Sequence, residues 1–209
     1  MGKFVKAVIF DVGGVLVRTE DPAPRERLAA EHGLSVKELY DIVFGSDTWG
    51  LVQLGSITSD DHWQAVGHRM GLVRPDGANA FRAAFFAGDR LDRELLDLIR
   101  QLRARYKIAL LSNAPGNLRH WIVREWEVPV NTFDEIVVSA EEGIMKPDPE
   151  IYCIALDRLG VLPQEAIFVD DFVENVEAAR ALGIKAIHFT SPEALRTELD
   201  SLLVERLEG

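Results

Sequence analysis

Carboxylates stand at the ends of two apolar runs in this sequence. Asp11 follows the run KAVIF (6–10), and the neighbours Asp170 and Asp171 end the run AIFVDD (166–171). Adjacent carboxylates repel one another, and a divalent cation bound through oxygen ligands relieves that repulsion most directly. The aspartate pair therefore indicates a metal-binding site more readily than a plain turn.

A hydroxyl, an amide and an ammonium group occupy similar positions. Ser112 and Asn113 end the run IALLSN (108–113), and Lys146 stands in GIMKPDPEIY (143–152), after a third apolar run. Taken singly, such residues have ordinary structural explanations as turn residues, helix caps or solvated loop residues. They gain chemical meaning only if one fold brings them together.

The elements around these residues predict such a fold. We expect strands at 4–10, 107–112, 135–138, 166–170 and 184–189, and helices at 92–105, 118–126, 149–159 and 173–182. This alternation predicts an α/β fold with a Rossmann-like parallel sheet, helices on both faces and a ligand site at the carboxyl ends of the strands. The polar residues of four segments would then converge at one edge of the sheet.

The stretch from residue 18 to 88 breaks the alternation. It shows helical patterns at 24–32, 36–44, 59–70 and 78–87 and no convincing strand, with breakers such as Asp21-Pro22 and Gly45-Ser46 between them. We therefore expect an α/β core made of residues 1–16 and 89–209, with a helical domain at 17–88 inserted after the first strand.

Composition excludes several classes of protein. The 209 residues carry a formal net charge of -11 and no run of Lys and Arg, so nucleic acid is an unsuitable partner. No segment predicts a signal peptide or a membrane span, so we expect no membrane association and a cytoplasmic location. The single cysteine, Cys153, has apolar neighbours and is expected to be a packed thiol.

Four stretches resemble the short motifs of the haloacid dehalogenase superfamily in their order and in the way each follows a strand. FDVGGVL (10–16) is similar to the nucleophile motif, LLSNA (110–114) to the second, MKPDPEIY (145–152) to the third and FVDDFVENVEAARALG (168–183) to the fourth. The inserted helices resemble the family's smaller type of cap domain, and we call residues 17–88 the cap. The resemblance implies a phosphatase that acts on a small phosphorylated metabolite.

The resemblance also implies a metal site. It makes Asp11 the nucleophile that attacks phosphorus and forms an aspartyl-phosphate intermediate, while Mg²⁺ binds Asp11, the backbone carbonyl of Gly13, Asp171 and a phosphoryl oxygen. Asp170 and Asn175 would support the metal indirectly or through water. If the following helix starts early, Asn175 faces the same side as Asp171.

The remaining motif residues are implied to bind the phosphoryl group. Lys146 would hold both Asp11 and the phosphate. Ser112 Oγ and the backbone N–H of Asn113 would donate to the other phosphoryl oxygens, where charge spreads in the transition state. The resemblance thus assigns catalysis to Asp11, Ser112 and Lys146.

Gly13 departs from the family pattern. Phosphatases of the family usually carry at this position a second aspartate, which protonates the leaving group and then activates water. A positioned acid-base is typically worth roughly 10² to 10⁴ in rate, so we expect slow turnover, a substrate with a good leaving group, or a substitute acid-base residue. His62 and His68 of the cap have suitable chemistry, although a surface position on a helix explains both more simply.

Two other functions stay open. A metal-binding or metabolite-binding protein with weakened catalysis would also retain these motifs, and Gly13 favours it. A haloacid dehalogenase lacks the second aspartate too, but its carboxylate attacks carbon without a metal, so the Asp170–Asp171 pair argues against it.

The cap is expected to determine substrate choice by closing over the strand ends. Its aromatic residues could line a pocket, but at helical spacing we expect them to form the core of the cap: Trp49, Trp63, Phe81, Phe85 and Phe86. Arg18 is a candidate for attracting a phosphate locally. An apolar face of the cap could also pair two chains into a homodimer.

Overall fold

The computed structural model describes residues 4–72, 74 and 76–204 and contains the expected parallel sheet. Its strand order is β5-β4-β1-β6-β7. The strands run over Ala7–Phe10 (β1), Lys107–Ser112 (β4), Glu135–Val138 (β5), Ala166–Asp170 (β6) and Lys185–His188 (β7). The prediction of a Rossmann-like α/β fold is confirmed, with strand ends that differ from the expected ones by a few residues.

The central strand β1 is buried along its whole length. Its four residues are all buried and pair in parallel with β4 on one side, from Ala7 with Lys107 to Phe10 with Leu110, and with β6 on the other. A strand covered on both faces must be apolar throughout, which explains why this run shows no alternation of polar and apolar residues. The register places the carboxyl ends of β1, β4 and β6 side by side.

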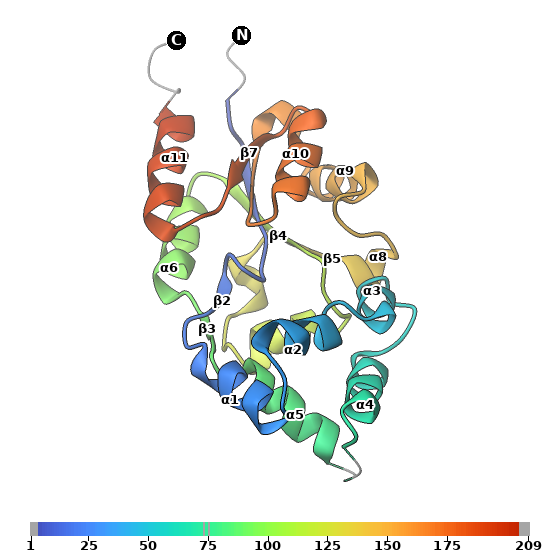
Figure 1. Ribbon diagram of the computed structural model, residues 1–209. Helices are drawn as coiled ribbons and strands as arrows, with labels where there is room; N and C mark the ends of the chain where they lie inside the picture. The colour runs from blue at the N-terminus through green and yellow to red at the C-terminus, as the bar shows by residue number, and fades with distance from the viewer. Residues whose placement is uncertain (1–3, 73, 75, 205–209) are drawn as a thin grey trace.

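Helices cover both faces of the sheet, as Figure 1 shows. One apolar cluster joins alternate strand residues to α6 (Arg93–Leu102), α7 (Leu118–Arg124) and α11 (Pro192–Val204). The other joins the remaining strand residues to α9 (Pro149–Leu159) and α10 (Val173–Ala181). Short elements complete this part of the chain: α8 (Ser139–Glu142), η1 (Val130–Thr132) and η2 (Pro163–Glu165). Each face of the sheet thus has its own hydrophobic core.

The described residues of the cap form five helices with a core of their own. They are α1 (Ala23–Glu31), α2 (Val36–Val43), α3 (Asp47–Gln53), α4 (Ser59–Arg69) and α5 (Gly77–Phe86). Their apolar cluster includes Leu39, Trp63 and Phe85 and draws its members only from positions 28–86. Four of these helices match the expected ones, whereas α3 was not foreseen because its seven residues are too short for a clear periodic pattern.

A short hairpin joins the cap to the core. Strand β2 (Val17–Thr19) pairs antiparallel with β3 (Asp89–Leu91), so both ends of the insertion leave the core together. The expectation of no strand near the start of the insertion was therefore wrong. Strands of three residues are too short to show alternation in the sequence.

Two single residues also differ from expectation. Cys153 is exposed, because it lies on the outer side of α9, whereas its neighbours Ile151 and Ala155 are buried. His62 has no exposed surface and lies inside the cap, while His68 on the same helix is exposed as expected. Among the described residues, no helix is long and apolar enough to cross a membrane.

Candidate active site

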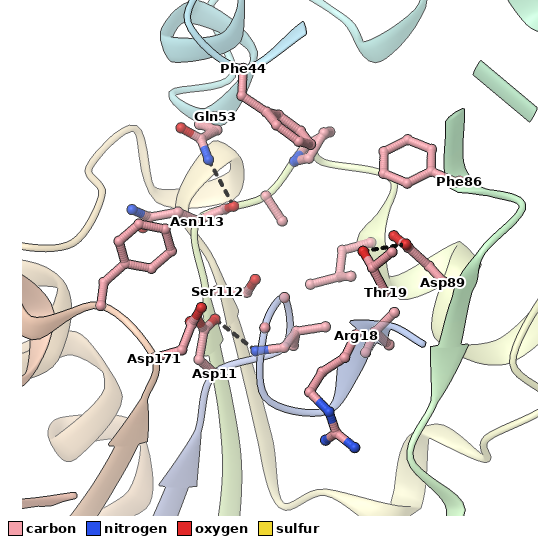
Figure 2. A pocket seen from close by; sticks show the side chains of 18 of the residues that line it. Asp11, Arg18, Thr19, Phe44, Gln53, Phe86, Asp89, Ser112, Asn113 and Asp171 are labelled. Carbon is pink, nitrogen blue, oxygen red and sulfur yellow. Dashed lines mark hydrogen bonds between the residues drawn. The ribbon is translucent and has the colours of Figure 1, made fainter. Parts of the chain in front are cut away.

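The ends of three neighbouring strands bring the candidate residues together. Asp11 directly follows β1, Ser112 is the last residue of β4, and Asp170 is the last residue of β6. Because β1 lies between β4 and β6, these side chains reach the same edge of the sheet. Figure 2 shows Asp11, Ser112 and Asp171 beside one another in the cavity. The side chains that the sequence placed at separate strand ends therefore form one cluster.

The carboxylate of Asp11 is held through one of its two oxygens. Oδ1 accepts the backbone N–H of Val12 at 2.7 Å and lies 2.9 Å from Nζ of Lys146. The backbone N–H of Asp11 donates to the carbonyl of Val169 at 2.8 Å, which ties the residue to the neighbouring strand β6. The side chain is therefore fixed in orientation, and Oδ2 has neither of the contacts that hold Oδ1.

Lys146 connects the two buried carboxylates. Its Nζ lies 2.9 Å from Asp11 Oδ1 and 2.6 Å from Asp170 Oδ2, and it donates to the carbonyl of Leu111 at 3.0 Å. An ammonium group has three protons to donate, so these acceptors use them all. The side chain of Asn113 holds the backbone of Lys146 through two hydrogen bonds of 2.8 Å, one in each direction. The amide of Asn113 thus positions Lys146, a role that its motif did not suggest.

Asp170 is satisfied by protein groups alone. It is completely buried, and its carboxylate accepts the backbone N–H of Phe172 at 2.8 Å and the side chain of Asn175 at 3.0 and 3.1 Å, besides the Lys146 ammonium. Asn175 therefore contacts Asp170 directly. Tyr152 in turn donates its hydroxyl to the carbonyl of Asn175 at 3.0 Å, which fixes the start of α10.

Asp171 provides the group that fits a cation. Its Oδ1 is buried and has no hydrogen-bond partner among the described residues. Asp11, Asp170 and Asp171 each offer an oxygen, and these oxygens lie within 4.8 Å of one another. Because burying an unpaired carboxylate oxygen is costly, a positive ion is the natural partner for Asp171 in this cluster. The residues present therefore fit a bound metal ion.

The two glycines after Asp11 have different surroundings. A Cβ atom at Gly14 would lie 2.1 Å from Asp171 Oδ2, and Gly14 also has a φ of +82°, so a side chain is excluded there on both counts. A Cβ atom at Gly13 would meet no atom within 4 Å, and Gly13 lines the cavity. The position where the family usually has its second aspartate is thus open space.

The charges of the cluster shift the pKa values of its members. Burial raises the pKa of Asp11 to about 7, although Lys146 opposes the shift, and the charge of Asp170 adds to it. Burial alone would lower the pKa of Lys146, but the charges of Asp11 and Asp170 outweigh it and leave this pKa above its ordinary value. Burial and the charge of Asp170 likewise raise the pKa of Asp171. The cluster combines three carboxyl groups with the single ammonium of Lys146. Its net charge is therefore negative when the carboxyl groups are ionised, which favours the binding of a cation.

A cavity of about 1280 Å³ extends from this cluster toward the cap. Of the five cap aromatics singled out in the sequence, Trp49 and Phe86 line it. The other three are buried in the core of the cap: Trp63, Phe81 and Phe85. Arg18 also lines the cavity, but its guanidinium donates to the carbonyl of Val15 at 2.7 Å and to Asp92 at 2.8 Å.

Gln53 of the cap contacts the site, although no feature of its sequence context indicates this. Its side chain donates to the carbonyl of Asn113 at 3.0 Å, as Figure 2 shows, and its own carbonyl accepts the hydroxyl of Ser139 at 2.6 Å. Ser139 also accepts the backbone N–H of Ala114 at 3.0 Å. These bonds join the end of α3 to the core directly beside the Asn113 loop.

Comparison with known proteins supports a hydrolase. A family model for haloacid dehalogenase-like hydrolases matches residues 5–183. The chain is 35% identical to a sesquiterpene phosphatase from Aspergillus oryzae, over 95% of its own length and 96% of that relative. It is 31% identical to acyl-CoA dehydrogenase family member 10 from Mus musculus, but it covers only 19% of that longer protein.

A solved structure also resembles the chain closely. A mutant of a haloacid dehalogenase family enzyme from Bacteroides thetaiotaomicron, in complex with magnesium and inorganic phosphate, superimposes with a TM-score of 0.72 at 25% identity. The match covers 90% of this chain and 95% of that one.

Proposed function

The chain belongs to the haloacid dehalogenase-like hydrolase family, as a phosphatase of that family, and on this premise we propose that it hydrolyses a small phosphate monoester through Asp11. The observation that carries the proposal is the pairing of a buried, oriented carboxylate at Asp11 with an unpartnered carboxylate oxygen at Asp171. The first suits a nucleophile and the second suits a metal ligand.

The reaction has two steps, and both use the geometry of Asp11. In the first, Asp11 Oδ2 attacks phosphorus, the ester P–O bond breaks, and the alcohol leaves with a proton taken from solvent. In the second, water attacks phosphorus, the bond from Asp11 to phosphorus breaks, and inorganic phosphate leaves. Lys146 and the N–H of Val12 hold Oδ1 throughout, so the attacking oxygen keeps its direction.

The ligands that would hold Mg²⁺ are Asp11, Asp171 and the carbonyl of Gly13. Asp170 and Asn175 would support the ion indirectly. Bound there, the ion supplies positive charge that keeps Asp11 ionised and neutralises phosphoryl oxygens. That charge matters because the pKa of Asp11 is raised to about 7 by burial, so part of the carboxyl group is protonated near neutral pH. Asp170 contributes indirectly, since its oxygens are occupied by protein donors.

Phosphate binding falls to Ser112 Oγ, the backbone N–H of Asn113 and Lys146. Ser112 and Asn113 both line the cavity beside Asp11, where a phosphoryl group would lie. Lys146 already has three protein acceptors, so its contact with phosphate requires it to share or exchange one of them. Its main role in this proposal is to hold the nucleophile in place.

Residues 17–88 act as the cap in this proposal and set the boundary of the site. The hairpin of β2 and β3 and the Gln53 contact hold the cap over the Asn113 loop. The missing acid-base at Gly13 is not replaced by His62, because that side chain lies inside the cap and bonds to Thr48 Oγ1 at 2.9 Å. A leaving group that departs without strong acid assistance is therefore favoured.

An aryl phosphate tests this proposal, since its leaving group needs little acid assistance. We expect hydrolysis in the presence of Mg²⁺, and loss of activity both with EDTA and in Asp11→Asn. Asn113→Asp serves to perturb the anchor of Lys146 while leaving Asp11 in place, and we expect it to retain partial activity. Turnover in Asp11→Asn equal to that of the wild type would contradict the aspartyl-phosphate mechanism. Mg²⁺ binding without any turnover would favour the binding protein considered above.

A further inference from the structure

The phosphatase site continues into a cavity whose lining indicates the chemistry of the alcohol that is released. Building on the proposed function, we infer that the substrate is the phosphate ester of an apolar alcohol, with a hydrocarbon or aromatic body in place of a sugar or polyol. The inference depends on the size of the cavity, on its aromatic walls and on the state of its polar groups.

The size of the cavity exceeds what a phosphoryl group requires. Its volume of about 1280 Å³ lies above the usual range of roughly 300 to 1,000 Å³ for small-molecule sites. The part of the cavity next to Asp11 and Ser112 accommodates the phosphoryl group in the proposed mechanism. The larger remainder lies between the cap and the core and is available for the leaving group.

Aromatic side chains form the walls of this remainder. Phe44, Trp49 and Phe86 line it from the cap, and Trp121 and Trp126 line it from the core. In Figure 2, Phe44 and Phe86 lie on the side of the cavity away from Asp11 and Asp171. The rings of Phe86 and Trp121 meet across the two parts of the protein at 6.0 Å between centroids. Burial against such rings favours an apolar body.

Several polar groups beside these rings are already bonded to protein. Arg25 pairs with Asp89 at 2.8 Å and donates to the hydroxyl of Tyr40, and Asp89 also accepts the hydroxyl of Thr19 at 2.8 Å. Gln53 donates to the carbonyl of Asn113. A polyol would have to compete with these bonds for its own, whereas an apolar body leaves them intact.

Phe172 adds an independent observation. It follows Asp171, lines the cavity and is 59% exposed, the highest value among the exposed large apolar side chains of the described residues. Its backbone N–H donates to Asp170, whereas its side chain is largely exposed. An apolar leaving group would cover this ring, and its position next to Asp171 places that group directly beyond the phosphoryl group.

A series of primary alkyl phosphates tests the inference, because leaving-group reactivity stays nearly constant while apolar length increases. Ethyl, butyl, hexyl and octyl phosphate are compared by kcat/KM, with hexitol 6-phosphate as the polar match of hexyl phosphate. Each buried methylene is worth up to about fourfold, so we expect at least about a tenfold rise from ethyl to hexyl phosphate. A flat series, or preference for the hexitol ester, overturns the inference.

Phe172→Ala tests the wall itself, with Phe4→Ala as the matched control. Phe4 is another exposed phenylalanine, at 45%, and does not line the cavity. We expect Phe172→Ala to reduce the hexyl-to-ethyl ratio of kcat/KM by at least about threefold, and Phe4→Ala to leave it unaltered. Equal ratios in the wild type and Phe172→Ala count against the inference.

Calorimetry with hexylphosphonate and ethylphosphonate in Mg²⁺ separates this inference from the proposed function, since it needs no turnover. Tighter binding of hexylphosphonate supports an apolar subsite even in a protein without phosphatase activity. Equal affinities overturn the inference, even if the aryl phosphate is hydrolysed and the proposed function stands.

Discussion

Replacing Lys146 by methionine tests how the buried cluster is held together. The side chain of Lys146 is only 1% exposed, and its ammonium contacts Asp11, Asp170 and the carbonyl of Leu111 within 3.0 Å. Methionine fills similar volume but removes the positive charge and all three donors. Two buried carboxylates would then face each other without the cation that separates them.

The magnitude follows from this geometry. Removing one partner of a buried ion pair typically costs about 3 to 5 kcal/mol, a large share of the roughly 5 to 15 kcal/mol that stabilises a domain. The loss should also depend on pH. Because Lys146 lowers the pKa of Asp11, removing it raises that pKa beyond about 7. A folded-state pKa raised above the unfolded value of 3.8 means that stability falls as pH rises between the two values.

Urea denaturation of the metal-free protein at pH 6, 7 and 8 measures the effect. Wild-type Asp11 is about half ionised near pH 7 and almost fully ionised one pH unit higher, whereas Asp11 in Lys146→Met continues to titrate beyond that range. The difference in unfolding free energy should therefore widen by up to about 1.4 kcal/mol per pH unit above pH 7. The control is Lys6→Met, because Lys6 is 59% exposed and pairs with Glu165 at the surface.

We expect the control to cost less than about 1 kcal/mol, as surface pairs do. A loss in Lys146→Met as small as that in Lys6→Met, or one that is the same at all three pH values, would refute the reasoning. Such a result would mean that the carboxyl groups of the cluster share protons or water without needing the ammonium.

Three further predictions concern single positions. Gly13→Asp should raise kcat for alkyl phosphates by roughly 10² or more, whereas Gly13→Asn should not, and equal rates for these two variants would contradict an acid-base role at this position. Gly14→Ala should abolish activity, because its Cβ would overlap Asp171. Mg²⁺ at about 100 times its Kd should stabilise the protein by about 2.7 kcal/mol in thermal unfolding, and Asp171→Asn should remove most of that gain. Burial lowers the pKa of His62 to about 4, so the free energy of unfolding should fall by about 2 to 3 kcal/mol as pH falls from 6.5 to 4. Urea denaturation should show that His62→Gln lacks this loss.

The fold and the convergence of the strand-end side chains were largely predictable from the sequence. Continuous apolar runs such as 107–112 indicated buried strands, and the helical patterns between them required a parallel sheet. A parallel sheet places all its carboxyl ends on one edge, so Asp11, Ser112 and Asp170 had to meet wherever the strands paired as they do. These statements needed only the local pattern of each element and the general rule that a parallel sheet places the carboxyl ends of its strands at one edge.

Contacts between distant segments were beyond the sequence. The bonds of Asn113 to the backbone of Lys146, the docking of Gln53 on the Asn113 loop and the choice of Asp170 as partner of Asn175 each depend on how loops pack in three dimensions. The same is true of Gly14, which must lack a side chain because Asp171 approaches it from another strand end.

Burial likewise separated residues of the same type. The sequence shows His62 and His68 as equivalent members of one helix, and Trp49 and Trp63 as equivalent aromatics of the cap. The packing of the cap buries His62 and Trp63, exposes His68 and turns Trp49 toward the cavity. The sequence by itself determined which chemical groups the strand ends would carry. Only the tertiary structure decided which of them are paired, which are free and which surface a substrate meets, because those properties depend on contacts between segments far apart in the chain.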